Sequence, residues 1–268
     1  MTRFPRAPLL ALLFAAAPVH AVGLPDTGQD ICYNDTTADT VAASSPASIA
    51  RDAGTHPRQD CRFGRDVAVA AGALSKIGAG AKGFDYTKIA NNGATLDAAA
   101  TLGTAATDWA CTRDNITGLT WEVKTATVTD PRYFGHTYNW YNTDTSTNGG
   151  NAGSTGGNTC GGTLQGNLCN TQAFVAAVNA AALCSYADWR MPTVRELFTL
   201  VSADNATLTI DSTYFPNTSA ASSFWTSSSY VAGLDLAWNV SFHIGNTPTS
   251  SKLSTSRNFV RLVRGGQF

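Results

Sequence analysis

The sequence predicts an α+β fold preceded by an irregular N-terminal extension. In residues 119–124 and 238–244, apolar and polar side chains alternate with a period of two, which is typical of strands. In residues 172–183, and again from residue 193, apolar residues recur on one face behind a polar cap, which is typical of helices. A last strand is predicted over residues 258–264, just before Gly265-Gly266.

The composition excludes some broad classes of protein. The 268 residues are 43% hydrophobic and 14% charged, with a formal net charge of −1. A nucleic-acid binder needs an excess of basic charge to displace phosphate counterions, so this class is not expected. No apolar run reaches the roughly 18 residues of a membrane span. We therefore expect a globular protein with few charges.

The first 21 residues resemble an export signal. Arg3 and Arg6 form a basic start, residues 9–17 are apolar, and Val19-His20-Ala21 fits a small-residue cleavage site. Cleavage after Ala21 would remove two arginines and leave a net charge of −3. We expect a secreted, periplasmic or cell-surface protein.

All six cysteines lie in the exported part, which favours three disulfides. They are Cys32, Cys61, Cys111, Cys160, Cys169 and Cys184. Six cysteines allow 15 sets of pairs. Proximity along the chain favours Cys160 with Cys169 and Cys32 with Cys61, which leaves Cys111 with Cys184. The spacing matches no zinc motif, so no metal or other cofactor is predicted.

The pattern sharpens from residue 111 onward. Residues 22 to about 65 show little periodicity, and residues 66–110 contain one predicted strand, at 84–89. We therefore divide the chain into a leader (1–21), an extension (22–110) and a domain (111–268).

Local signals mark the start of each predicted helix. Thr171 is the expected cap of the first helix. Thr193 and Glu196 form a capping box for the second, in which each side chain bonds the backbone of the other residue. Leu197, Leu200 and Val201 then form its apolar face. The capping box gives Glu196 a structural role.

Four ordered segments resemble the motifs of one family. They are DNITGLTWE at 114–122, DWRMPTVREL at 188–197, FWTSS at 224–228 and FVRLVRGG at 259–266. These segments resemble the Lcl C-terminal domain family, also called domain of unknown function 1566. The residues with a predicted structural role in these motifs are Trp121, Asp188, Trp189, Arg190, Thr193, Glu196 and Arg264.

The resemblance implies a C-type-lectin-like fold with two helices and a twisted antiparallel sheet. It also implies export and, from the collagen-like adhesin that gave the family its name, polysaccharide binding. The motifs are also similar to those of formylglycine-generating enzymes. Their chemistry needs a cysteine pair near the chain end, whereas the last cysteine here is Cys184.

The strongest candidate for ligand binding is an aromatic segment that leads into a loop rich in Gly, Asn, Ser and Thr. Its candidate residues are Tyr138, Asn139, Trp140, Tyr141 and Asp144. Aromatic faces stack on sugar C–H groups, and amides and carboxylates bond hydroxyl groups. The alternative is that Trp140 belongs to the core and the loop is a surface insertion.

Basic residues near the C-terminus form a second candidate. Lys252, Arg257 and Arg261 would contact an acidic polysaccharide if they share one face. For Arg261 and Arg264 the alternative is a structural role, which we favour for Arg264.

The sequence therefore predicts a non-enzymatic binding or adhesion protein for a surface glycan or a partner protein. The negative net charge favours a neutral glycan. One alternative is a secreted hydrolase that uses Glu122 and Asp188 as paired carboxylates. Against it, Asp188 and Arg190 are expected to form a structural ion pair beside Trp189. A structural subunit of a surface appendage is the other alternative.

Overall fold

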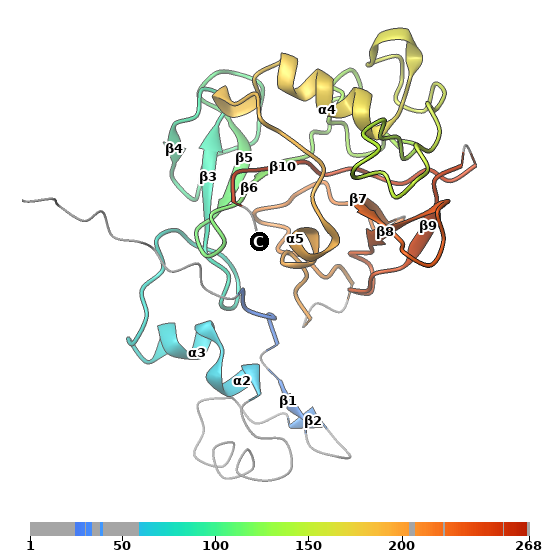
Figure 1. Ribbon diagram of the computed structural model, residues 1–268. Helices are drawn as coiled ribbons and strands as arrows, with labels where there is room; N and C mark the ends of the chain where they lie inside the picture. The colour runs from blue at the N-terminus through green and yellow to red at the C-terminus, as the bar shows by residue number, and fades with distance from the viewer. Residues whose placement is uncertain are drawn as a thin grey trace, which may run out of the picture.

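The computed structural model describes most of the chain from residue 59 onward and short pieces before it. The described residues are 25–29, 31–33, 38–39, 59–203, 207–221, 223–253 and 255–266. The predicted leader lies outside them. Within this part of the chain, helices and antiparallel strands occur together, as an α+β fold requires (Figure 1).

A five-stranded antiparallel sheet forms one half of the domain, in the order β10-β6-β5-β3-β4. Its strands are β3 (Tyr86–Ala90), β4 (Thr95–Leu96), β5 (Trp109–Asp114), β6 (Thr120–Glu122) and β10 (Val263–Arg264). The strand predicted at 84–89 corresponds to β3. Two of the strands precede residue 111, so the sheet includes residues that the sequence assigned to the extension. The strand predicted over 258–264 is regular only in β10, and isolated bridges extend it at Asn258 and Phe259.

A three-stranded antiparallel sheet forms the other half, in the order β7-β8-β9. Its strands are β7 (Phe224–Ser229), β8 (Leu236–Val240) and β9 (Thr249–Ser251). The prediction of one strand over 238–244 is correct only to Val240. The chain then turns, Gly245 takes a φ of +66°, and Ile244 is 64% exposed.

Two helices lie over these sheets, α4 (Thr171–Ala180) and α5 (Val194–Phe198) (Figure 1). The capping box of α5 is confirmed, with Thr193 as its cap. The cap of α4 is Asn170 rather than Thr171, because the Asn170 side chain accepts the Ala173 amide. No described helix has the length and apolar character needed to span a membrane.

The core consists of two clusters that meet at the sheets. One cluster includes Phe174 of α4, Trp189 and Leu262, and the other includes Leu197 of α5 and Val263. Consecutive residues Leu262 and Val263 therefore point into different clusters, as expected for a strand. The strand predicted at residues 119–124 is present as β6, but the prediction that it is half-buried is wrong, because every one of these side chains is buried.

Three disulfides cross-link the fold, and all three favoured pairings are confirmed. Cys111 of β5 is bonded to Cys184 of η2 (Leu183–Ser185), and Cys160 to Cys169. Cys32 is bonded to Cys61, which joins β1 (Cys32–Tyr33) to α2 (Asp60–Phe63).

The N-terminal segment is partly regular and contacts the domain. Besides β1 and α2 it contains β2 (Ala38–Asp39) and α3 (Arg65–Ala70). The Asp26 carboxylate accepts the Arg65 amide, and the Thr27 carbonyl accepts the Ala203 amide at 2.7 Å. The short helix η1 (Gln165–Asn167) lies within the loop that the disulfide between Cys160 and Cys169 closes.

Candidate functional site

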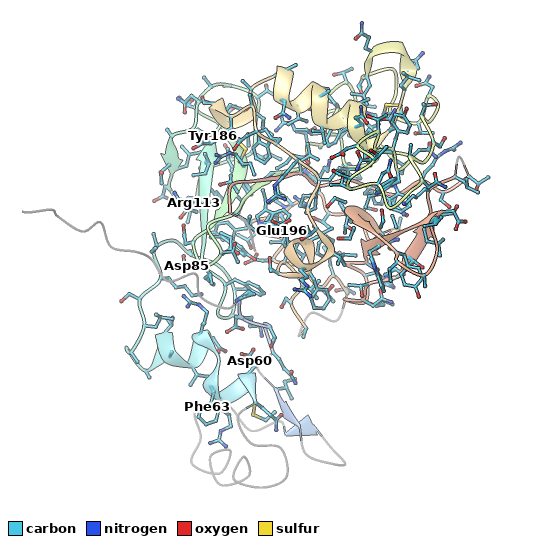
Figure 2. The ribbon with its side chains drawn as sticks, viewed as in Figure 1. Asp60, Phe63, Asp85, Arg113, Tyr186 and Glu196 are labelled. Atoms are coloured by element: carbon cyan, nitrogen blue, oxygen red, sulfur yellow. A yellow bond between two sulfur atoms is a disulfide. The ribbon has the colours of Figure 1, made fainter. Side chains whose placement is uncertain are left out.

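A cleft of about 580 Å³ lies between the aromatic loop, the start of α4 and the segment that opens α5. Its lining residues are Trp140, Tyr141, Asn142, Asp144, Thr147, Thr171, Gln172, Val175, Arg190, Met191, Thr193, Glu196 and Ser227. Glu196 lies at α5, well away from the N-terminal helix that carries Asp60 and Phe63 (Figure 2). The cleft therefore belongs entirely to the C-terminal part of the chain.

The first turn of α4 holds the aromatic loop in place. The Thr171 hydroxyl accepts the Tyr141 amide at 3.0 Å and donates to the Tyr141 carbonyl at 2.8 Å. The Gln172 side-chain oxygen accepts the amide and hydroxyl of Thr143. Both bonds use the Gln172 oxygen, and Gln172 itself lines the cleft.

Asp144 is an exposed, ionised carboxylate on the same loop. It accepts hydrogen bonds from the hydroxyl and amide of Ser146 and from the hydroxyl of Thr147. These bonds lower the pKa of Asp144. The side chain folds back on its own turn, so the loop presents negative charge at neutral pH.

Arg190 and Glu196 form the opposite wall. The guanidinium donates two bonds to the carboxylate, at 2.6 and 2.9 Å, and two more to the carbonyls of Gly265 and Gly266. Burial raises the pKa of Glu196, but the bonds from Arg190 and Thr193 outweigh it, and the net pKa is lowered. This wall is a fixed ion pair, because both partners are held by further bonds.

The cleft combines an aromatic ring, amides and a net negative charge. The half-buried Tyr141, Val175 and Met191 supply apolar surface. Asn142 and Gln172 supply amide groups. One guanidinium and two carboxylates leave a formal charge of −1. Such a lining suits a ligand with apolar faces and hydroxyl groups, and it disfavours a polyanion.

The segments that build this cleft lie within one recognised family domain. A family model described as the Lcl C-terminal domain matches residues 110–264, more than half of the chain. The chain belongs to the Lcl C-terminal domain family. No curated protein and no solved structure matches it. Every cleft residue lies inside the matched range.

Only part of the predicted aromatic site faces this cleft of the Lcl C-terminal domain. Tyr141 and Asp144 line it. Tyr138 and Asn139 are buried, and Tyr138 donates its hydroxyl to the Pro131 carbonyl at 2.6 Å. Trp140 reaches the cleft but is only 1% exposed, with its indole N–H bonded to the Thr226 carbonyl. The prediction that Tyr138 and Asn139 contact a ligand is wrong, because both side chains are buried in the core, whereas Trp140 is a buried residue that still lines the cleft.

The predicted basic surface does not form in the Lcl C-terminal domain. Lys252 and Arg261 are fully buried, whereas Arg257 is exposed. The Arg261 guanidinium donates to the Glu122 carbonyl and the Thr218 hydroxyl and lies 5.0 Å from the Phe215 ring centroid. Burial lowers the pKa of Arg261 to about 10. The prediction of a shared basic face is therefore wrong, because two of the three cations are buried among carbonyl groups and aromatic rings.

The two predicted hydrolytic carboxylates occupy different environments. Glu122 is fully buried, 2.8 Å from the Lys124 ammonium, and accepts the Leu262 amide. Asp188 is 58% exposed and bonds Arg264 at 2.7 Å. Neither belongs to the cleft lining. The expected pair of Asp188 with Arg190 is also wrong, because Asp188 bonds Arg264, 76 residues away, and Arg190 bonds Glu196, six residues further along the same motif.

Other motif residues have the structural roles that the sequence predicted. Trp121 and Trp189 are buried, and the Trp189 indole N–H donates to the Leu183 carbonyl. Arg264 lies 3.6 Å from the Tyr186 ring centroid. Within the described residues, no group of three or more His, Cys, Asp or Glu side chains is placed to hold a metal ion.

The wall of the cleft that lies opposite the aromatic loop was not predicted from the sequence. Arg190, Met191 and Thr193 stand in a family motif that we assigned to structure alone, and Gln172 and Val175 were read only as helix residues. These positions lie within or just before predicted helix starts. Two helix starts that face the same aromatic loop form the cleft.

Proposed function

We propose that this protein is an exported, non-enzymatic binding protein that recognises a neutral surface glycan. The lining of the 580 Å³ cleft carries this proposal: a half-buried tyrosine beside amide groups, with a net charge of −1. Tyrosine rings stack on the apolar faces of sugars, and amides bond their hydroxyl groups. A fixed ion pair, Arg190 with Glu196, adds further polar atoms to one wall.

Two observations support export and a lectin-like fold. The three disulfides are typical of an oxidising compartment, which agrees with the leader-like first 21 residues. We also propose that the domain is C-type-lectin-like, because two short helices pack on twisted antiparallel sheets. Adhesion to a glycan-bearing surface is the role that we infer from the family resemblance.

A hydrolase that uses Glu122 and Asp188 is less well supported. A glycosidase needs two carboxylates that face one bond of the substrate, at most about 9.5 Å apart. Glu122 is inaccessible to solvent and neutralised by Lys124, and Asp188 is neutralised by Arg264.

A glycan array with residues 22–268 tests the proposal, followed by titration of the best neutral oligosaccharide. Tyr141→Ala should weaken binding at least about tenfold, because it removes the stacking surface. Tyr230→Ala is the matched control, since this half-buried tyrosine packs on Trp238 outside the cleft lining. Binding should change little between low and high salt.

Three results would contradict the proposal. The first is binding to heparin-like glycans that weakens steeply with salt, because it would indicate an acidic ligand. The second is equal loss of affinity in Tyr141→Ala and Tyr230→Ala. The third is no binding to any glycan, which would favour a protein partner or a structural subunit.

A further inference from the structure

Lys252 is a buried cation with an unusual set of partners. Its side chain is 0% exposed. The ammonium donates to the Asn148 carbonyl at 2.8 Å, the Ser229 hydroxyl at 3.0 Å and the Leu234 carbonyl at 3.0 Å. The Asn151 carbonyl lies at 3.5 Å. Among the described residues, no carboxylate contacts this ammonium.

An aromatic ring completes the environment of this cation. The Lys252 ammonium lies 4.3 Å from the ring centroid of Trp140. An ammonium over an indole face is attracted by the negative face of the ring, and more strongly where water is excluded. Trp140 also borders the cleft, so the cation and the cleft share one side chain.

These contacts join segments that are far apart in sequence. Asn148 and Asn151 belong to the aromatic loop, Ser229 ends β7, and Leu234 lies in the turn before β8. The loop between β6 and α4 lies against the β7–β9 sheet in Figure 1. The loop has no strand partner over residues 142–152, so these bonds provide much of its attachment to the sheet.

The close fit of the loop depends on the same contacts. A Cβ at Gly149 would lie 2.6 Å from the Ser229 Cβ, and a Cβ at Gly153 would lie 2.2 Å from the Trp140 carbonyl. The loop backbone therefore lies close to Ser229 of the sheet at Gly149 and close to the Trp140 carbonyl at Gly153. Here the ammonium donates to the carbonyl of the buried Asn148 and to the partly buried carbonyls of Leu234 and Asn151.

We propose that Lys252 is a positioning residue whose charge holds the loop of residues 142–153 in the shape that forms one wall of the cleft. Its four protein oxygens resemble the ligand set of a bound cation, so the lysine acts as a tethered cation. The effect on loop order is independent of any ligand, whereas the effect on affinity rests on the proposed function.

Hydrogen exchange in the full chain tests the proposal, with Lys252→Met as the first variant. Methionine fills nearly the same volume without charge. The Asn142 and Ser154 amides, which bond the Ala152 and Trp140 carbonyls, should exchange about 10- to 100-fold faster. The amides of β5 and β6 should be unchanged. Affinity for the neutral oligosaccharide should fall in the same variant.

Lys88→Met is the matched control. Lys88 is also buried, donates to the Ala100 carbonyl at 2.8 Å and lies 4.0 Å from the Trp109 ring centroid. It makes the same kind of contact in the other sheet. Lys88→Met should therefore accelerate amide exchange around Ala100 and leave the exchange of residues 142–153 unchanged.

Chemical rescue separates charge from packing. In Lys252→Ala, propylammonium should restore slow exchange in the loop, whereas propanol of similar size should not. Ser229→Ala removes one acceptor and should accelerate the same amides by a smaller factor, which provides the test if the lysine variants do not fold.

Several results would overturn the proposal. One is unchanged amide exchange in the loop in both Lys252→Met and Ser229→Ala. Another is that propanol restores slow exchange in Lys252→Ala as well as propylammonium does. The third is that Lys88→Met accelerates exchange in the loop as much as Lys252→Met does. Loosened loop amides without any glycan binding by the wild type would instead contradict only the proposed function.

Discussion

At the scale of single residues, aromatic rings and carbonyl oxygens take the place of water around buried cations. Lys88, Lys124, Lys252 and Arg261 are buried, and each contacts at least one aromatic ring. Only Lys124 among them has a carboxylate within 4 Å in the described structure. Burial of a charge without such partners costs several kcal/mol, so these sites depend strongly on each contact.

The buried Lys124 predicts a characteristic pH dependence of stability. Burial, opposed by the attraction of Glu122, lowers the pKa of Lys124 from 10.5 to about 8. Between these two values the unfolded chain binds the proton and the folded chain does not, so this lysine makes stability rise with pH.

Urea unfolding of the wild type and of Lys124→Met at several pH values checks this expectation. The free energy of unfolding of the wild type should rise relative to the variant by up to about 3 kcal/mol between pH 8 and 10.5. Tyr86 and Tyr138 have pKa values raised by burial, so they make stability fall at high pH. Their contribution is the same in the wild type and the variant and is removed by the comparison. A constant difference across this range would show that Lys124 keeps its proton.

Two glycines distinguish backbone strain from steric contact. Gly153 and Gly118 both have positive φ, +82° and +74°, but only Gly153 has a close neighbour for a Cβ. Gly118→Ala should therefore cost about 1–2 kcal/mol from strain alone. Gly153→Ala should cost about 2–5 kcal/mol, because overpacking against Trp140 adds to the strain. Thermal or urea unfolding measures both, and equal losses would contradict the close packing of the loop.

At the scale of the elements, the start of α5 is both a cap and a wall of the cleft. Glu196 accepts the backbone amide of Thr193 at 2.8 Å and also bonds Arg190. The bond to the Thr193 amide fixes where the helix begins. The bond to Arg190 holds the segment before the helix in place. One carboxylate thus links the helix geometry to the position of the cleft wall.

Substitution of Glu196 should reduce stability by more than the loss of a cap alone. Glu196→Ala should cost about 1–3 kcal/mol at pH 7, since it also leaves the half-buried Arg190 without a carboxylate. Glu196→Gln, which keeps an acceptor for Thr193, should cost less. Because the pKa of Glu196 is lowered in the fold, its contribution should be present above about pH 4.5 and should disappear as the pH falls through its folded value. Urea unfolding at pH 7 and pH 3 measures both effects. If Glu196→Ala lowered the free energy of unfolding equally at both pH values, the ion pair would be contradicted.

The elements also show which parts of the sequence could be interpreted alone. The capping box of α5 and the disulfide between Cys160 and Cys169 depend on neighbours in sequence, and both were predicted. Asp188 and Arg190 were predicted to pair with each other, whereas Asp188 bonds the distant Arg264 and Arg190 bonds Glu196 across the turn that opens α5. Lys252 was assigned to the surface, since charge in a sequence does not reveal the carbonyls that surround it in the fold. For the same reason, only the aromatic wall of the cleft was predicted.

At the scale of the whole molecule, the disulfides close loops of very different length. The bond between Cys111 and Cys184 spans 73 residues and ties the five-stranded sheet to the end of the α4 region. The bond between Cys160 and Cys169 spans 9 residues within one loop. The longer loop loses more conformational freedom in the unfolded chain.

The two disulfides should therefore differ in their contribution to stability. Replacing Cys111 and Cys184 together by serine should lower the free energy of unfolding by about 4 kcal/mol, and replacing Cys160 and Cys169 by about 3 kcal/mol. Urea unfolding without reductant measures both, and peptide mapping should find no free thiol in the wild type. A larger loss from the shorter loop would contradict an origin in chain entropy.

The closed base of the aromatic loop has a consequence for how this protein can change over evolution. Tyr141 and Gly153 pair directly across the base of the loop, and Asn142 bonds Ala152 just inside it. Doubling the length of a loop between fixed ends costs only about 0.6 kcal/mol in closure entropy. Insertions near Asp144 are therefore compatible with an unchanged scaffold, provided that two loop carbonyls still reach Lys252. The loop can diversify its ligand preference in the way that a hypervariable segment does, while the disulfide-bonded sheets remain constant.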